Sequence, residues 1–384
     1  MGGSAFSASL PASALPRIPP AVYYAVKARL TPRLESLYSI VSTPHEAPEK
    51  ADHGDLDFLV CEPLNRAMGE VPHDAVQALL VAKYVMPMAG NRTSSYAVCI
   101  ELGEWGPLGH ASEEEDARRR AMETDNQQEI YYQVDVHVCS DKAEWERIQF
   151  FNGYGDLGMI MGLVARNKGL ALGSKGLKVP HVPRTPFELS VSMDEIMQYM
   201  GLSMERWKAG FQTKHEVFEW VATSSLFDPV RFQAEGQGFK KVKPERKMYT
   251  QFVQWVREKQ KHLADSGSVD GGLPQEEQVQ HALKYFGKKE QFDALNREDA
   301  EKARLKDGFN GTKVREWTGL AGGQWKELKM IMDEVRGRVG GEPGILKILV
   351  EQGEEGIKEY VLQAKEKLGV QGTALPEQEE AAEG

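Results

Sequence analysis

The sequence predicts an α+β protein in which a domain of interleaved strands and helices comes first and a helical half follows. Three observations lead to this fold class. Short alternating apolar stretches are mixed with helix-patterned stretches up to Pro180. Beyond Pro180, apolar residues recur at spacings of three and four. The length of 384 residues exceeds one compact core, so about two or three domains are expected.

The first domain is expected to contain these elements in order. A helix covers 21–37, although Pro32 interrupts its hydrogen bonding. A second helical pattern covers 76–85. The charged block 110–128 is either a solvated loop or an exposed helix. Strands are predicted at 38–41, 56–61, 96–101 and 130–138.

The rest of the chain is expected to be helical. The pattern is clearest over 193–218 and 249–256, and the segment 264–278 has linker composition. The N-terminus is acid-free and rich in Ser, Ala and Pro, which fits a disordered tail or a mitochondrial presequence. The expected parts are the tail 1–20, the mixed domain 21–180, a helical region 181–263, a C-terminal helical module 279–368 and an acidic disordered tail 369–384.

Composition excludes several classes of protein. With 41% apolar and 27% charged residues, the chain is not a mostly disordered protein. It has no run of about 18 apolar residues, so no membrane-spanning helix and no membrane partner are expected. The net charge of -10 means that a nucleic acid would need a local basic patch.

The cysteines indicate a compartment. Cys61, Cys99 and Cys139 each follow a valine in an apolar run, which predicts buried strand thiols and fits neither a disulfide framework nor a zinc site. We therefore expect an intracellular protein of the cytoplasm or nucleus. The acid-free N-terminus leaves the mitochondrion as an alternative.

Two carboxylates stand at the start of a predicted strand. Because side chains alternate along a strand, Asp55 and Asp57 point to one face, and Leu56 and Phe58 to the other. At ~4 Å and an effective dielectric of ~20, two such charges repel by about 4 kcal/mol. A hard divalent cation such as Mg²⁺ offsets that repulsion. The alternative is a solvent-facing strand end without a metal.

A second strand carries a third carboxylate. Val134, Val136 and Val138 alternate with Gln133, Asp135 and His137, so Asp135 lies on the face opposite the valines. If this strand lies beside the first, three carboxylates meet and can hold two metal ions ~3.5–4 Å apart. His137 is expected at the rim of such a site.

An aromatic motif follows directly. Phe150, Phe151 and Asn152 precede Gly153, and Asp156 then begins a helix that it can cap. The aromatic pair either stacks on a base or sugar, or packs in the core.

Taken in this order, the motifs resemble the polymerase-beta-like nucleotidyltransferase superfamily, closest to family X DNA polymerases and related viral, phage and fungal enzymes. The resemblance covers roughly 35–260 and implies a nucleotidyltransferase palm followed by a thumb-like region. In the family, a G-D-x-D strand and a later Asp strand bind the metals, and these match Asp55, Asp57 and Asp135. The implied cofactors are two Mg²⁺ or Mn²⁺ ions, with a nucleoside triphosphate as substrate.

The resemblance also implies a nucleotide site. Ser42 and nearby amides would hold the triphosphate. The family's nucleotide-pocket motif is similar to Phe150, Phe151 and Gly153, and its helix ending resembles 165–172. The phosphate contacts expected from this likeness are Arg166, Lys168 and Lys175.

The sequence departs from the family in three respects. The glycine that usually precedes the serine is Val41 here, so the amides have less room to approach a phosphate. Phe150 has no hydroxyl where the family commonly has a tyrosine. No glycine-rich hairpins precede the palm, which argues against a gap-filling repair polymerase.

The expected function is metal-dependent transfer of a nucleoside monophosphate from an NTP or dNTP to a hydroxyl, with release of pyrophosphate. The expected acceptor is an RNA or DNA 3′ end, and a protein or a small molecule is a further option. The alternative function is a catalytically inactive protein of this fold that binds nucleic acid or a protein partner. The expected nucleic-acid grip, whose alternative is a core helix with a solvated basic face, comprises Lys240, Lys241, Lys243, Arg246 and Lys247.

Overall fold

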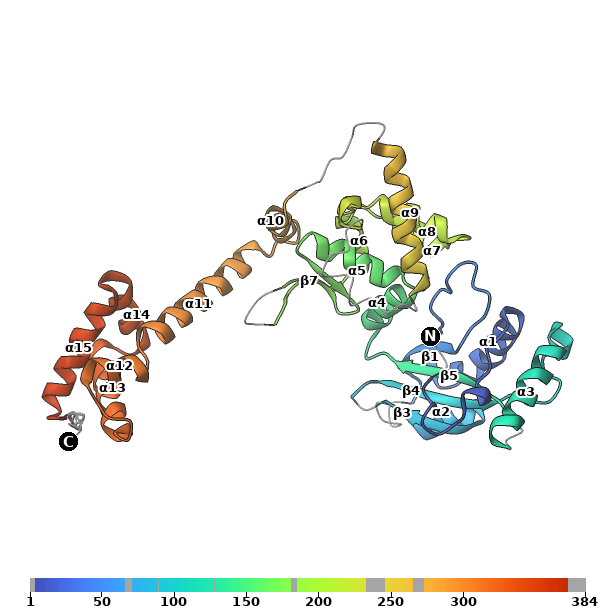
Figure 1. The fold of residues 1–384 in the computed structure, drawn as a ribbon, viewed down its shortest axis with the longest axis horizontal. Coiled ribbons are helices and arrows are strands. Elements are labelled where there is room, and N and C mark those ends of the chain that lie inside the picture. Colours follow the sequence, from blue (N-terminus) through green and yellow to red (C-terminus); the bar gives the residue numbers. More distant parts are fainter. Residues whose placement is uncertain are drawn as a thin grey trace, which may run out of the picture. The chain divides into compact units, whose positions relative to one another are not determined.

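The structure is a computed structural model of a chain that divides into two compact units, Met1–Phe286 and Gly287–Gly384 (Figure 1). It combines helices with a mixed sheet, which confirms the α+β class. Among the described residues, no helix is both long and apolar enough to cross a bilayer. The described residues are 4–65, 71–88, 90–126, 129–180, 185–232, 246–264 and 273–371.

A five-stranded mixed sheet organises the first part of the larger unit. The strands are β1 (Tyr38–Ser42), β2 (Leu56–Pro63), β3 (Ala82–Pro87), β4 (Thr93–Cys99) and β5 (Tyr131–Val138). Their spatial order is β1-β2-β5-β4-β3. β2 and β5 are parallel, and every other neighbouring pair in this sheet is antiparallel. The two aspartate-bearing strands are therefore direct neighbours.

Three helices cover one face of this sheet (Figure 1): α1 (Pro20–Glu35), α2 (His73–Leu80) and α3 (Ala111–Asp125). Their apolar side chains pack on the valine face of β5, where Val134, Val136 and Val138 are buried as predicted. Pro32 lies inside α1 without ending it. The charged block is an exposed helix, one of the two predicted forms.

The helix predicted over 76–85 is wrong in its second half. α2 ends at Leu80, and Val81 takes a left-handed conformation with φ of 54°. The chain then enters β3, whose residues pair with β4. The apolar pattern of this segment is compatible with a helix or a strand. The segment forms a strand because its backbone can hydrogen-bond to the edge of β4.

The N-terminal residues also differ from the prediction. Over 4–19 they include a short 3-10 turn, η1 (Ala12–Ala14), and they pack on the sheet instead of forming a disordered tail. Phe6, Leu10 and Ala14 are buried against Ala97 and Tyr131. Apolar residues at spacings of four thus cover an apolar part of the sheet that the helices leave open.

The region after β5 contains helices and a small sheet. Helices α4 (Lys142–Asn152) and α5 (Leu157–Asn167) lead to an antiparallel sheet of β6 (Ala171–Gly173), β7 (Gly176–Val179) and β8 (Phe187–Ser190). The prediction that everything after Pro180 is helical is wrong at β8. Its backbone pairs with β7, so the edge of the hairpin receives a third strand.

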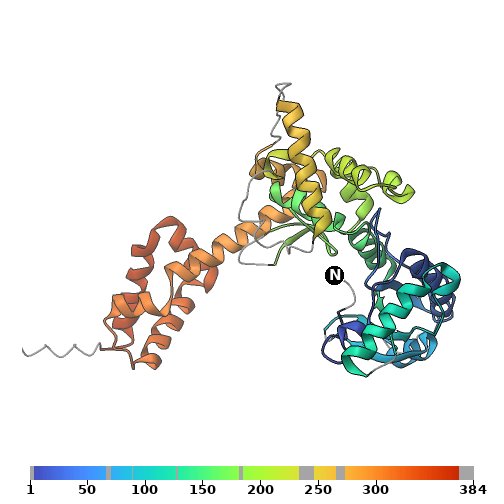
Figure 2. The ribbon, with the colours of Figure 1, turned by 45° about the vertical axis from the view of Figure 1, so that its right-hand side comes forward.

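Further helices complete the larger unit. They are α6 (Met193–Tyr199), α7 (Met204–Ala209), α8 (Lys214–Ala222), the turn η4 (Pro229–Phe232), α9 (Lys247–Ala264), which is the long yellow helix in Figure 2, and α10 (Gln275–Tyr285). α10 was expected in the C-terminal module. It belongs to the larger unit, because its Gln278 donates a 2.6 Å hydrogen bond to the Tyr199 hydroxyl of α6.

The smaller unit is helical, as predicted. It consists of α11 (Lys289–Gly308), α12 (Gly311–Thr318), α13 (Trp325–Val339), α14 (Glu342–Glu351) and α15 (Gly353–Lys367). Its own apolar core includes Val314, Ile331, Val335, Ile357 and Val361. Most of the expected acidic tail, 372–384, lies outside the described residues.

We predict that Phe6→Ala destabilises the larger unit by about 3 kcal/mol, because it leaves a cavity under the sheet-bound N-terminal segment. Phe6 is only 1% exposed. The free energy of unfolding in urea measures the effect, and Ser7→Ala at the exposed neighbouring position is the control. Equal stability of the two variants would mean that the segment does not pack on the sheet.

Candidate metal centre

Strand register brings the three predicted carboxylates together. In the parallel ladder of β2 and β5, Asp57 is the direct partner of Asp135. Asp55 lies two residues before Asp57 and, by strand alternation, shares its face. One ligand oxygen from each of the three carboxylates lies within 4.8 Å of the others. The predicted cluster is therefore confirmed as a geometric feature.

The electrostatics of the cluster favour a cation. Burial raises the pKa of Asp135 to about 6, and the charge of Asp55 adds to this shift. Solvent reaches the surface of Asp57, yet protein surrounds it on most sides, and this desolvation raises the pKa of its carboxyl above the ordinary range. The charges of Asp55 and Asp135 raise it further. Three clustered carboxylates supply the hard oxygen ligands that Mg²⁺ or Mn²⁺ takes, so the donor set fits such an ion.

A network of side-chain contacts braces the loop that carries Asp55. Glu46 accepts hydrogen bonds from the Tyr23 hydroxyl at 2.5 Å and from Lys50 Nζ at 2.6 Å. His53 Nδ1 lies 3.2 Å from the same carboxylate, and its ring stacks on Tyr23 with centroids 3.7 Å apart. Although burial raises the pKa of Glu46, these three contacts lower it to about 2. The loop is thereby tied to α1.

Ser42 has a structural contact where a triphosphate contact was predicted. Its hydroxyl accepts a 2.8 Å hydrogen bond from Trp145 Nε1 and donates one of 3.2 Å to Gln149 Oε1. Gln149 Nε2 in turn donates to the Thr43 carbonyl at 3.0 Å. These bonds fasten the end of β1 to α4, and triphosphate binding by Ser42 remains a prediction.

The aromatic motif packs in the core, the second of the two predicted alternatives. Phe150 is 0% exposed and stacks on Trp207 with centroids 5.2 Å apart, and its contact with a nucleotide remains a prediction. A Cβ at Gly153 would lie 3.1 Å from Trp207, which explains the glycine by close packing. Phe151 is half-buried. Asp156, expected to cap α5, instead accepts hydrogen bonds from Arg246 at 2.9 Å and from the Tyr249 backbone at 3.1 Å.

The three residues predicted to contact phosphate differ in burial. Lys168 is buried and pairs with Asp228 at 3.2 Å, and its role as a phosphate contact remains a prediction. Arg166 is exposed at the end of α5, and Lys175 is exposed in the turn between β6 and β7. Nothing in the described residues draws either of them to the carboxylate cluster, and their phosphate roles remain predictions.

The basic helix is described only from Arg246 onward. Tyr249 and Phe252 are buried, whereas Arg246 and Lys247 are exposed, so α9 has a core face and a solvated basic face, as in the alternative prediction. The other three lysines of the predicted nucleic-acid grip, Lys240, Lys241 and Lys243, lie outside the described residues.

Sequence reasoning missed a cavity beside Ser42. It measures about 320 Å³ and is lined by residues that include His45, Trp145, Gln149 and Trp207. His45 stacks on Tyr154 with centroids 4.8 Å apart, and burial lowers the pKa of its imidazole. The lining residues come from four separate segments of the chain, so no linear sequence motif predicts the cavity.

His137 was expected at the rim of the metal site. Its Nδ1 forms a 2.8 Å hydrogen bond with the Thr93 hydroxyl.

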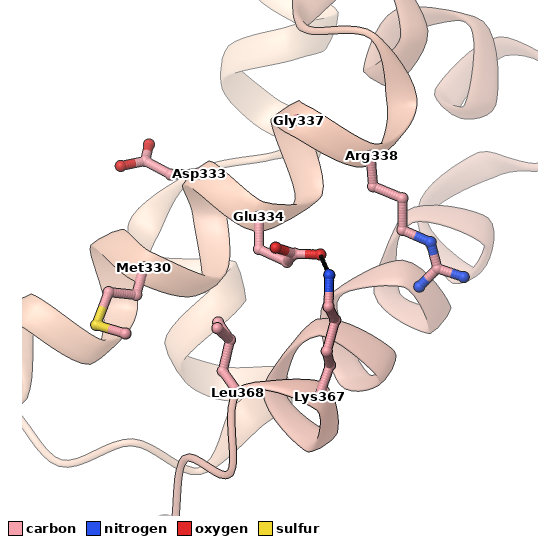
Figure 3. Close-up of a pocket in the computed structure, with 7 residues that line it drawn as sticks. All are labelled: Met330, Asp333, Glu334, Gly337, Arg338, Lys367 and Leu368. Atoms are coloured by element: carbon pink, nitrogen blue, oxygen red, sulfur yellow. Dashed lines mark hydrogen bonds and ion pairs between the residues drawn. The ribbon is translucent and has the colours of Figure 1, made fainter.

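The smaller unit has an open hollow of about 830 Å³ between α13 and the end of α15 (Figure 3). Lys367 Nζ reaches across it to Glu334 at 2.6 Å. Arg338 stacks over the Tyr360 ring with its guanidinium 5.3 Å from the centroid. These charged groups hold the two helices together and present no catalytic arrangement.

Comparison with known proteins adds no family to this geometry. No protein-family model matches the sequence, and no curated protein matches it. Functional inference therefore depends on the site itself.

We predict that Asp135→Asn changes the pH dependence of stability. The folded-state pKa of Asp135 is raised to about 6, above its unfolded value, so ionisation on going from about pH 4 to about pH 7 destabilises the native wild type. In metal-free buffer, the variant should gain about 2 kcal/mol relative to wild type over that interval. Urea unfolding at several pH values measures it. A stability difference that does not vary with pH would contradict the assigned shift.

We also predict that Lys168→Met destabilises the larger unit by about 3 kcal/mol, because the buried Asp228 carboxylate would lose its nearer ionic partner and keep Arg231, at 4.0 Å. The side chains of this pair are 5% and 10% exposed. Arg166→Met at the exposed position is the matched control and should be neutral. Chemical denaturation separates the two variants. A neutral Lys168→Met would mean that the ion pair with Asp228 does not stabilise the fold.

Proposed function

We propose that this chain is a metal-dependent nucleotidyltransferase that moves a nucleoside monophosphate from a nucleoside triphosphate to a hydroxyl and releases pyrophosphate. The observation that carries the proposal is the register pairing of Asp57 with Asp135, with Asp55 on the same face. The family resemblance drawn from the sequence supports the same activity. A nucleic-acid 3′ end is the proposed acceptor.

The reaction assigns a task to each carboxylate. Asp55 and Asp57 would hold two Mg²⁺ or Mn²⁺ ions, and Asp135 would share the one on the acceptor side. When bound, the ions polarise the triphosphate and lower the pKa of the acceptor hydroxyl. The acceptor oxygen forms a bond to the α-phosphorus, the bond from that phosphorus to the bridging oxygen breaks, and pyrophosphate leaves. Asp135 would take the acceptor proton as the new bond forms.

A second candidate function rests on a different observation. Ser42, Phe150 and Lys168 are all engaged in internal contacts, so three of the residues expected to bind the nucleotide are committed to packing. This favours a protein of the same architecture that binds nucleic acid or a protein partner without catalysis. Calorimetric titration with Mg²⁺ and a non-hydrolysable triphosphate separates the two functions, because only the enzyme requires metal-dependent triphosphate binding.

We predict that Asp57→Asn lowers nucleotidyl transfer by roughly a thousandfold, the scale of a lost electrostatic contact in the transition state. The assay uses Mg²⁺ or Mn²⁺, each labelled triphosphate, and a panel of RNA and DNA ends. Asp116→Asn, on the exposed face of α3, is the matched control and should retain wild-type activity. Full activity in a folded Asp57→Asn would reject the site. No transfer by the wild type would favour the binding function or a different acceptor.

A further inference from the structure

A chain of hydrogen bonds joins the N-terminal segment to the carboxylate cluster. The backbone N–H of Ala5 donates to Gln133 Oε1 at 3.0 Å. The side-chain amide of Gln133 then donates through Nε2 to both oxygens of Asp135, at 3.1 and 3.2 Å. The segment expected to be a disordered tail therefore contacts the metal ligands through one intermediate side chain.

Burial lets the protein partners set the orientation of the Gln133 amide in this series of hydrogen bonds. Gln133 is 3% exposed, so protein groups rather than water decide which way its amide points. An amide has an acceptor side and a donor side. Because the Ala5 N–H can only donate, the carbonyl oxygen of Gln133 must face it, and the NH₂ group must face Asp135. The ionised Asp135 carboxylate only accepts hydrogen bonds and favours the same orientation, so the Ala5 N–H reinforces this orientation and fixes where the Gln133 amide lies.

Apolar packing fixes the position of the Ala5 donor. Phe6 and Leu10 are buried on the same face of the sheet as Gln133, against Ala97 and Tyr131. A turn also closes over Ala5, since the N–H of Ser7 donates to the Ser4 carbonyl at 3.2 Å. Ala5 is the second residue of that turn, and its own N–H is thus free to point at the sheet.

We propose that residues 4–18 form a strap whose Ala5 N–H, acting through Gln133, positions the Asp135 carboxylate for a divalent cation. Gln133 is a positioning residue and Ala5 supplies the donor that orients it. The inference rests on the proposed metal-binding function of the cluster. Hydrogen-bond partners of ligating carboxylates set the orientation of the ligand, and losing one weakens metal binding by about 10- to 100-fold.

The test removes the backbone N–H donor of residue 5 and leaves the other hydrogen bonds to Gln133 and Asp135 in place. Ala5→Pro deletes the N–H at the second position of a turn, where a proline is accommodated. Ala5→Ser keeps the N–H and nearly the same volume, so it is the matched control. The probe is Mn²⁺ alone, titrated calorimetrically into the 384-residue chain. We expect Mn²⁺ affinity to fall about 10-fold in Ala5→Pro and to stay at the wild-type value in Ala5→Ser.

A double-mutant cycle distinguishes positioning from a general loss of structure. Gln133→Met preserves the shape of the side chain but removes the amide, and it should weaken Mn²⁺ binding about 10-fold. Because Ala5 acts through Gln133, Ala5→Pro should cause no additional loss in the Gln133→Met background. If the two substitutions caused independent structural defects, their losses of Mn²⁺ binding free energy would add. The thermal midpoints of the metal-free variants are recorded alongside.

The outcomes separate this inference from the proposed function. Wild-type Mn²⁺ affinity in folded Ala5→Pro, additive losses in the cycle, or wild-type affinity in Gln133→Met would each overturn the strap and leave the carboxylate cluster intact. If Ala5→Pro does not fold, Gln133→Met alone decides. If Asp57→Asn and Asp135→Asn bind Mn²⁺ as the wild type does, the metal site itself is wrong.

Discussion

The parallel pairing of β2 with β5 is the constraint on which the site depends. It sets Asp57 beside Asp135, and two like charges at ~4 Å repel by about 4 kcal/mol at an effective dielectric of ~20. The same register places Phe58 and Val136 together on the opposite face, in the core beneath the helices. Apolar burial on that face therefore holds a register that is electrostatically unfavourable on the other. A strand slip of one residue would expose the valines and bury the aspartates.

The two faces of the sheet have different supports. Helices α1, α2 and α3 cover the valine face, whereas the N-terminal segment covers an apolar part of the carboxylate face. The loop before β2 is braced separately, through Glu46, Tyr23 and His53. Both carboxylate-bearing segments are thus held by groups outside their own strands. A site of this kind can keep its geometry while its charges repel.

Residues that a motif marks for ligand binding can be needed for packing instead. Phe150 and Gly153 form a close contact with Trp207 of α7, and Ser42 fastens β1 to α4. Lys168 satisfies a buried aspartate. In each case the side chain meets a partner that is distant in the sequence. The three carboxylates come together as the sequence predicted, and they carry the functional argument.

The sequence by itself determined the local patterns. Strand alternation put Asp55 and Asp57 on one face and separated Asp135 from its flanking valines, because a period of two needs no tertiary information. Helical spacing likewise identified the C-terminal module. Tertiary structure decided what long-range contacts control: that β2 lies beside β5, that the chain after Leu80 becomes a strand, and that the N-terminus packs on the sheet. Pairing partners and burial depend on residues far apart in the chain, which local periodicity does not encode.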